Sequence, residues 1–256
     1  MKTLVLLQKE FKETMRTSKI FVLPAVFIFI AITSPLLAKF TPDFINMMVQ
    51  YTGQQINIVM PPPTYVDAFV QLFKNIGQMG LLVMLFVFAG TMVEEKTKGT
   101  ATLILTKGVS RSGFVASKFI YATFFMTAIY LVMTGIFAFY ASLLFPDTPW
   151  DKALVGLAIV WLYCEMVLAV IVLGSVLCKT YLSSAVFGLM WFFGFSILGS
   201  IPIVGQYTPG YCITLALERF QNDFFFVAYA WPIGTSLLVI LGAVVIALRA
   251  FKHQEF

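Results

Sequence analysis

Six long apolar runs divide the chain, with polar or charged segments between them. The runs cover residues 20–38, 76–93, 119–145, 153–177, 181–199 and 231–248. Each run is close to the roughly 20 apolar residues that a helix needs to cross the hydrocarbon core of a membrane. Backbone groups inside a membrane must find their hydrogen bonds within the protein, so we expect all six runs to be helices. The pattern predicts an all-α integral membrane protein with six spans, folded as a single domain over residues 1–256.

Residues 1–19 show a different pattern in front of the first apolar run. Apolar side chains recur at helical spacing at Leu4, Leu7, Phe11 and Met15, while Lys, Arg and Glu occupy many of the other positions. This spacing predicts an amphipathic helix whose apolar face lies on the inner surface of the membrane. The alternative is a cytosolic helix that leads into the first span.

Two further segments fit neither pattern. Residues 39–75 begin as a polar stretch, contain three consecutive prolines at 61–63, and end in an amphipathic stretch over residues 65–75. Consecutive prolines disfavour a helix, so we expect the stretch 65–75 to be a separate helix on the outer leaflet or, alternatively, in the core of a small external cap. Residues 200–230 mix Pro and Gly with aromatic residues, which predicts short re-entrant or surface helices on the outer face.

Composition and charge agree with a membrane protein. The chain is 60% hydrophobic, against about 45–50% for soluble domains. Of its 17 Lys and Arg residues, thirteen fall in segments that six spans place on one side. Cytoplasmic loops carry such an excess, so we expect a multi-pass protein of the cell membrane with both termini in the cytoplasm. Topology therefore explains the net charge of +5, and we expect no nucleic-acid partner.

Several kinds of catalytic chemistry find no support in the sequence. The three cysteines, Cys164, Cys178 and Cys212, are scattered, and His253 is the sole histidine. This pattern predicts no metal site and excludes a histidine-dependent catalytic triad. The GxxxxGK[ST] motif that cradles nucleotide phosphates is also missing from the sequence. We therefore expect no enzyme activity and no cofactor on this chain.

The most charge-rich segment between two runs covers residues 94–118. A central Lys or Arg in a span costs about 2.5–3.5 kcal/mol, so this segment should lie in water beside the membrane. Its middle, residues 100–105, is apolar enough for a short helix between two glycines. The candidate functional residues are the polar residues and glycine around this helix, with two leucines inside it: Glu94, Glu95, Gly99, Thr100, Leu103, Leu105, Arg111 and Lys118. On charge alone, the segment also fits an ordinary loop that only sets orientation.

The order of these residues resembles the loop between the second and third spans of type-2 (ABC-2) export permeases of ATP-binding-cassette transporters. In that family an acidic residue ends the second span, Gly-Thr opens a short coupling helix, and Ser-Arg and a Lys lead into the third span. The resemblance implies an N-terminal elbow helix on the membrane and a coupling helix that docks on a separate ATPase subunit. ATP and Mg would then bind the ATPase, and a second permease copy or a paralogue would complete the transporter. The chain departs from the family at Gly108, where proline is frequent.

One carboxylate lies inside a predicted span. Glu165 is 12 residues into the run 153–177, so at about 1.5 Å per residue it should lie near the middle of the membrane. We expect it to face the protein interior, and since no basic residue is predicted at that depth, hydroxyl groups or water should be its partners. The expected hydroxyls are those of Tyr130, Thr134 and Ser196. The functional hypothesis is a polar contact for a cationic substrate or a protonation-linked gate, and the alternative is a hydrogen bond that only joins two helices.

The resemblance predicts the membrane-spanning subunit of an ATP-driven exporter of a drug, an antimicrobial peptide or a similar amphipathic substrate. Two other functions remain compatible with the residues. One is a sensor or membrane anchor that recruits a cytosolic ATPase without transport, and the other is a secondary transporter.

Overall fold

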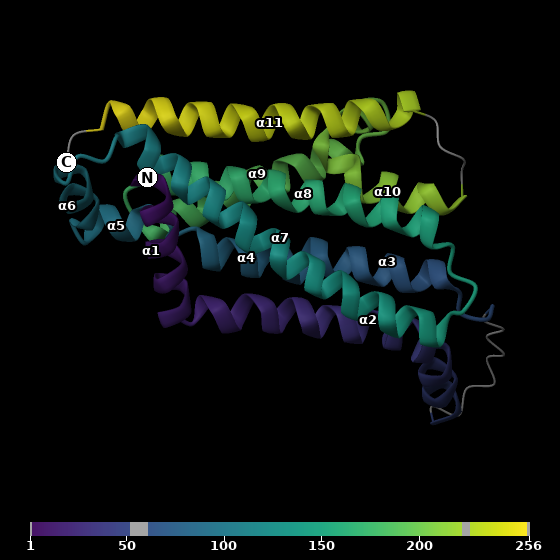
Figure 1. Cartoon of the computed structure of the whole chain (residues 1–256). Coiled ribbons are helices and arrows are strands. Elements are labelled where there is room, and N and C mark those ends of the chain that lie inside the picture. Colours follow the sequence, from purple (N-terminus) through teal and green to yellow (C-terminus); the bar gives the residue numbers. More distant parts are fainter. Residues whose placement is uncertain (1, 52–60, 222–225, 255–256) are drawn as a thin grey trace.

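The computed structural model describes residues 2–51, 61–221 and 226–254 (Figure 1). Within these ranges all regular elements are helical and none is a strand. In chain order they are α1 (Lys2–Arg16), α2 (Lys19–Tyr51), α3 (Tyr65–Asn75), the π-helical turn η1 (Ile76–Gly80), α4 (Leu81–Phe88), α5 (Val93–Thr97), α6 (Thr100–Thr106), α7 (Arg111–Leu144), α8 (Trp150–Leu177), α9 (Tyr181–Ser200), the 3₁₀ turns η2 (Gly205–Tyr207) and η3 (Pro209–Tyr211), α10 (Cys212–Gln221) and α11 (Phe226–Lys252).

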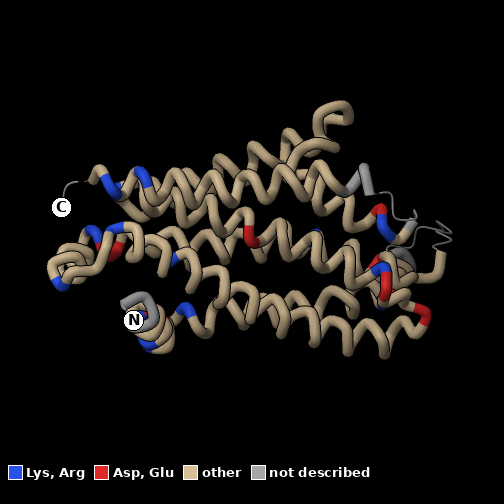
Figure 2. Tube along the Cα trace, turned by 45° about the horizontal axis from the view of Figure 1, so that its top comes forward, with Lys and Arg blue, Asp and Glu red and all other residues tan. Residues whose placement is uncertain are grey.

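Six segments of the described chain are long and apolar enough to cross a membrane. They are Lys19–Met48, Tyr65–Thr97, Arg111–Leu144, Trp150–Leu177, Tyr181–Ser200 and Ala230–Lys252. Each contains one of the six predicted runs or nearly all of it, so the predicted fold class is confirmed. The segments lie side by side in one bundle (Figure 1), and most charged residues gather at its two ends (Figure 2). The protein is a multi-pass membrane protein.

Helix α8 is the centre of the bundle. It packs against α4, α7, α9, α10 and α11, and every residue from 163 to 176 is buried. This stretch is apolar all round except for Glu165 and Ser175, and a helix of that kind belongs in the middle of a packed structure. The other spans expose many more apolar side chains, as expected of surfaces that contact lipid or another protein.

The first span is longer than its apolar run. We predicted an end near residue 38, but α2 continues to Tyr51 through Pro24, Pro35 and Pro42. Prolines are tolerated in membrane helices when nearby hydroxyls and neighbouring helices satisfy the backbone. Next to Pro35, the Ser34 hydroxyl donates to the carbonyl of Ile30 at 2.7 Å. The predicted polar segment 39–75 is thus largely helical where it is described, and its residues 52–60 lie outside the described chain.

The predicted surface position of residues 65–75 is wrong. Helix α3 runs directly into η1 and α4, so it extends the second span. Its side chains Phe69, Leu72 and Phe73 are completely buried and pack against α2 and α10. The amphipathic pattern of residues 65–75 arises because one face of α3 is turned to the protein core. The alternative prediction also placed this helix in a core, but in that of a small external cap, whereas α3 packs into the core of the main bundle.

Residues 200–221 form short helices, as predicted for this part of the segment 200–230. Helix α10 does not lie on the surface, however, because it packs against α8 and buries Cys212, Leu215 and Ala216. The turns before α10 come very close to the end of α9. A Cβ atom on Gly210 would lie 1.9 Å from the carbonyl oxygen of Phe195, so only glycine allows this approach.

Helix α1 runs across the end of the bundle rather than along it (Figure 1). The face that packs on the bundle carries Leu6, Glu10 and Thr14, all buried, whereas Phe11 and Met15 are exposed. The Phe11 and Met15 part of the apolar stripe is therefore exposed, whereas Leu7 is half-buried. This arrangement leaves the exposed part free for the membrane surface, as a membrane-lying helix requires.

Candidate functional site

The segment between the second and third spans folds as two short helices that end in glycine turns. α5 carries Glu94 and Glu95, and α6 begins after Gly99. The predicted helix over residues 100–105 is present and is one residue longer. Gly99 and Gly108, with φ angles of 69° and 76°, are the two positions of positive φ in the described chain. Proline holds φ near −65°, so the turn at Gly108 excludes the proline that is frequent at this position in the ABC-2 permeases.

The two leucines of α6 have different surroundings. Leu103 is 64% exposed, while Leu105 packs against the core of the bundle. Ala101, on the same inner face, is completely buried. Helix α6 therefore keeps one large apolar side chain free in a polar neighbourhood. We predicted a docking role for both leucines, but this arrangement offers Leu103 alone.

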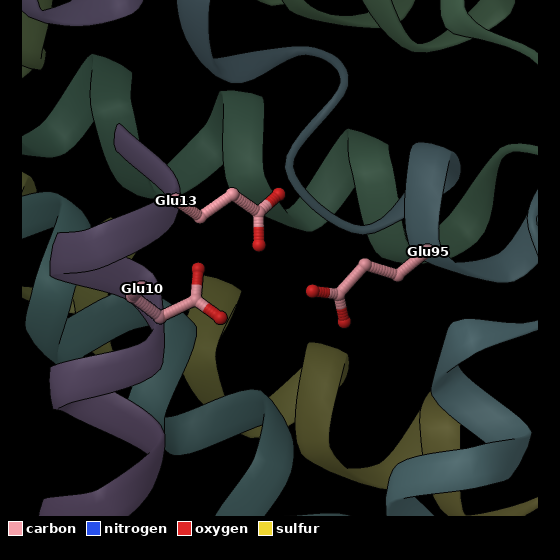
Figure 3. A group of neighbouring side chains, drawn as sticks. All are labelled: Glu10, Glu13 and Glu95. Atoms are coloured by element: carbon pink, nitrogen blue, oxygen red, sulfur yellow. The ribbon is translucent and has the colours of Figure 1, made fainter. Parts of the chain in front are cut away.

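A network of charges joins α1, α5 and α7, with three buried and two half-buried or exposed members, and we call it the charged junction: Glu10, Glu95 and Lys118, then Lys9 and Glu13. Figure 3 shows Glu10 and Glu13 of α1 and Glu95 of α5 pointing toward one another. The ammonium of Lys118 lies 2.7 Å from Oε2 of Glu10 and 2.8 Å from Oε1 of Glu95. Lys118 is 2% exposed and Glu95 is 4% exposed. These two predicted site residues thus meet, with a partner on α1 that the sequence did not identify.

Lys9 completes the charged junction at its more exposed side. It pairs with Glu10 at 3.1 Å, with Glu13 at 2.8 Å and also with Glu95. Partial burial by itself lowers the pKa of Lys9, but the neighbouring carboxylates outweigh it and hold the pKa above its usual value. Partial burial likewise raises the pKa of Glu13, but the hydrogen bond and charge of Lys9 outweigh it and hold the pKa below its usual value. Both residues therefore keep their charges around neutral pH.

The three carboxylates of the charged junction lie close enough to one another to hold a metal ion. One oxygen atom from each of Glu10, Glu13 and Glu95 falls within 4.8 Å of the others. The two lysine ammonium groups already lie among these oxygens, so a cation would have to displace them. The arrangement fits an ion-pair network better than a metal site.

Glu94 differs from its neighbour Glu95. Its side chain is 39% exposed, and its nearest charged partners are Lys98 at 3.5 Å and Lys19, at the start of α2, at 3.9 Å. Exposed pairs at such distances contribute little to stability. Of the two neighbouring glutamates, Glu95 is thus buried in the charged junction, and Glu94 is the more exposed one.

Two basic residues of the segment bind the ends of other helices. The guanidinium of Arg111 donates hydrogen bonds to the carbonyls of Lys252 and Gln254, at 2.8 and 2.7 Å. The ammonium of Lys96 donates to the carbonyls of Val176 and Cys178, both at 2.7 Å. Such contacts satisfy carbonyls that the last turn of a helix leaves free. The contact of Arg111 with an ATPase stays a prediction, and in this structure the same side chain caps α11. The role of Lys96 at the end of α8 was not predicted.

Glu165 lies deep in the bundle, far from the charged junction, and is 5% exposed. Its Oε1 accepts a hydrogen bond from the hydroxyl of Thr127 at 3.0 Å, and Nε1 of Trp161 donates to the same hydroxyl at 3.1 Å. Its Oε2 is buried and accepts no hydrogen bond within the described chain. None of the ion pairs between described residues includes Glu165.

The predicted partners of Glu165 are right in kind and wrong in identity. A hydroxyl group on the third span does bind the carboxylate, but it belongs to Thr127. The hydroxyl of Tyr130 donates instead to the carbonyl of Leu157. That of Thr134 is buried and has no hydrogen-bond partner among the described residues. The hydroxyl that binds Glu165 is that of Thr127 and not that of Ser196. The exact rotation of α7 against α8 decides which hydroxyl is in reach, and packing sets that rotation.

Comparison with known proteins gives one distant relative. The chain is 22% identical over 258 residues to the uncharacterized transmembrane protein YxlG of Bacillus subtilis (strain 168), and the alignment covers 98% of each chain. This similarity supports a multi-span membrane protein. No protein-family profile matches the chain, so the likeness to the ABC-2 permeases remains a resemblance.

Proposed function

We propose that this chain is the membrane-spanning subunit of an ATP-driven exporter, and that a separate ATPase subunit docks on α6. The observation that carries the proposal is the exposed Leu103 on a short helix outside the spans, together with the connections of that helix to the bundle. The segment on each side of α6 is fixed by buried or charged contacts. A single exposed leucine is common on protein surfaces, so it supports the proposal through its place on this anchored helix and through the resemblance of the segment to a coupling helix.

The contacts around α6 suggest how force would pass from the ATPase to the spans. Before α6, Glu95 of α5 joins α1 and α7 in the charged junction, and Lys96 binds the end of α8. After α6, Arg111 binds the end of α11. A displacement of α6 would therefore act on four helices at once. Packed elements of this kind move between discrete states rather than deform gradually.

The remaining parts of the proposal follow from the resemblance. ATP and Mg would bind the ATPase, since this chain has no P-loop. A second copy or a paralogue would pair with it around the transport path. The end of the bundle with α1 and α6 would face the cytoplasm, and the substrate would be a drug, an antimicrobial peptide or a similar amphipathic molecule. Reporter fusions test the orientation: those at Lys107 and Lys252 should read cytoplasmic and one at Thr148 external, and an external reading at Lys107 contradicts the proposal.

The docking test uses Leu103→Asp in cells that express the chain with its native chromosomal neighbours. We expect the parent chain to co-purify with an ATPase that carries a P-loop. In the variant this ATPase should be lost while the chain stays in the membrane, because a charge replaces the apolar contact. His253→Asp is the matched control, since His253 is also exposed and follows α11, whose end Arg111 joins to the start of α7.

Each outcome of this test decides between functions. If Leu103→Asp retains the ATPase as the parent does, α6 is not the docking helix. If the parent binds the ATPase but reconstituted vesicles show no ATP-dependent transport, the chain is a sensor or anchor. If it transports without any ATPase, it is a secondary transporter.

A further inference from the structure

Glu165 has a free hydrogen-bonding capacity that the fold does not use. The carboxylate is 5% exposed and receives a single hydrogen bond, from Thr127 to Oε1. Its Oε2 has no donor among the described residues. A carboxylate inside a membrane protein usually pairs with another group and marks a functional site when it does not. Because the site lacks a positive partner of its own, it favours a ligand that brings one.

The groups around the carboxylate are those that recognise an organic cation. Trp161 precedes Glu165 by one turn of α8 and is fixed by its hydrogen bond to Thr127. A carboxylate binds an ammonium group through charge and hydrogen bonds, and the hydroxyl oxygen of Thr127, which the indole N–H of Trp161 holds in place, lies beside it. Together they can replace the hydration that an amine loses on entering the membrane.

The site borders an exposed apolar surface. Ile120, Phe124 and Leu131 form a stripe along α7 and are all more than half exposed. Thr127 lies on this same face, at helical spacing between Phe124 and Leu131. At the α1 end, the stripe joins a groove of about 620 Å³ between α1 and α7, which Ile120 and Phe124 help to line. An amphipathic ligand could thus lay its apolar part along the stripe while its charged group reaches the carboxylate.

We propose that Glu165 and Thr127 bind the ammonium group of a lipophilic amine, whose apolar part lies along the Ile120–Leu131 stripe of α7, and that Trp161 positions Thr127. This inference deepens the proposed function by naming its substrate class. It rests on that function only for the statement that the bound amine is exported. Binding itself requires no ATPase.

The first test measures binding to the purified full chain in nanodiscs of zwitterionic lipid, without ATP or ATPase. The probe is a long-chain primary alkylamine with a dansyl group at its far end, detected by energy transfer from tryptophan. The matching dansyl alcohol is the uncharged control probe. Glu165→Gln keeps the shape of the side chain and removes its charge, and Asp151→Asn makes the same change at an exposed position of the same helix.

We expect saturable binding of the amine that weakens about tenfold or more in Glu165→Gln, equal to a loss of about 1.4 kcal/mol or more. Asp151→Asn should bind the amine as the parent does, and the alcohol should show no saturable binding to any of the three proteins. Equal binding of the amine to the parent and to Glu165→Gln overturns the proposal. So does saturable binding of the alcohol as strong as that of the amine.

A second test uses the parent chain and does not depend on how a variant folds. Dicyclohexylcarbodiimide adds to a carboxyl group in an apolar environment, and rearrangement gives a stable N-acylurea without another reactant. Mass spectrometry then measures the rate of modification at Glu165. We expect an unlabelled tertiary N,N-dimethylalkylamine, which cannot form a stable amide with the activated carboxyl, to slow the reaction several-fold, and the corresponding alcohol to leave it unchanged. Equal rates with amine and alcohol overturn the proposal.

The two proposals can fail separately. Amine binding by a chain that has no ATPase partner keeps this site and overturns the exporter. ATP-dependent transport that is identical in the parent and in Glu165→Gln, with no amine binding, keeps the exporter and overturns this site.

Discussion

The charged junction and the Glu165 site are both buried and charged, but they satisfy their charges in opposite ways. In the junction, the ammonium of Lys118 lies within 2.8 Å of two carboxylates. In the bundle, Glu165 has one hydroxyl donor and one carboxylate oxygen without a donor. Oε2 of Glu95 also lacks a hydrogen bond among the described residues, so the difference lies in the ammonium groups: each carboxylate of the junction pairs with one, and Glu165 pairs with none in the described chain. The difference separates a structural from a ligand-binding use of the same side-chain type.

The largest effect on stability is expected when Lys118 is removed from the charged junction. Lys118→Met leaves Glu10 and Glu95 buried without their main partner, and breaking a buried pair in this way costs about 3–5 kcal/mol. We expect the free energy of unfolding, measured by titration with a denaturing detergent in mixed micelles, to fall by this amount. A further change of Glu10 to Gln should recover part of the loss, because one carboxylate fewer then remains unpaired.

Lys98→Met is the control for this experiment. Lys98 is exposed and lies 3.5 Å from its partner Glu94, so its removal should cost less than about 1 kcal/mol. Equal losses in Lys98→Met and Lys118→Met would show that the charged junction is not a buried network.

The same substitution, Glu to Gln, tests directly whether the two sites differ in their contribution to stability. Glu95→Gln removes the charge that Lys118 and Lys9 share, so we expect it to cost about 1–3 kcal/mol of the free energy of unfolding. Glu165→Gln removes a charge that has no ionic partner, so we expect a change within about 1 kcal/mol, in either direction. Both values come from the same detergent titration. A loss at Glu165 as large as that at Glu95 would indicate that Glu165 serves assembly of the bundle.

The smallest expected effect is the dependence of α1 on pH. The pKa of Glu13 lies below its usual value of 4.5, so the stabilisation by its pair with Lys9 is complete above that value and is lost as the pH falls through the lower pKa. The pKa of Lys9 is raised from 10.5, so its contribution is complete below 10.5 and is lost as the pH rises through the higher pKa. The attachment of α1 should therefore be constant around neutral pH.

A dye on Phe11→Cys, in a background with Cys178→Ser, reports the attachment of α1. We expect its anisotropy to fall below about pH 4.5, and this change should shrink in Glu13→Gln, which cannot ionise. Since the Glu13 side chain is 42% exposed, the difference should correspond to less than about 1 kcal/mol after screening by solvent. An identical acid transition in both proteins would assign it to other carboxylates.

The sequence predicted those features that depend on local pattern. Run length predicted the six spans, and Gly99 with Gly108 bracketed the short helix α6. The charges of Glu95 and Lys118 marked both as functional candidates. These signals are local because hydrophobicity along a span and backbone freedom at a glycine act on single segments.

The features that sequence reasoning missed depend on contacts between distant segments. Glu10 meets Lys118 across 108 positions, and no pattern near either residue indicates that pair. Glu94 and Glu95 look alike in sequence. The conformation of the turn between α4 and α5 sets the direction of each side chain and so decides which one is buried. Thr127, rather than Tyr130, reaches Glu165 because of the rotation of α7. The extension of α2 past Pro42 was missed because proline is a weaker helix breaker inside a membrane than in water.

The carbonyl of Val176 accepts hydrogen bonds from Lys96, at 2.7 Å, and from Gln254, at 2.9 Å, and this has a consequence for the order of synthesis. The charged junction needs no residue beyond 118, so it can form while the rest of the chain is still being translated and inserted. The end of α8 receives its second donor only after residue 254 has left the ribosome. Chains begin to fold during synthesis, with N-terminal parts available first. We therefore expect a nascent intermediate in which α1, α5 and α7 can already be joined while α6 is fixed on one side only.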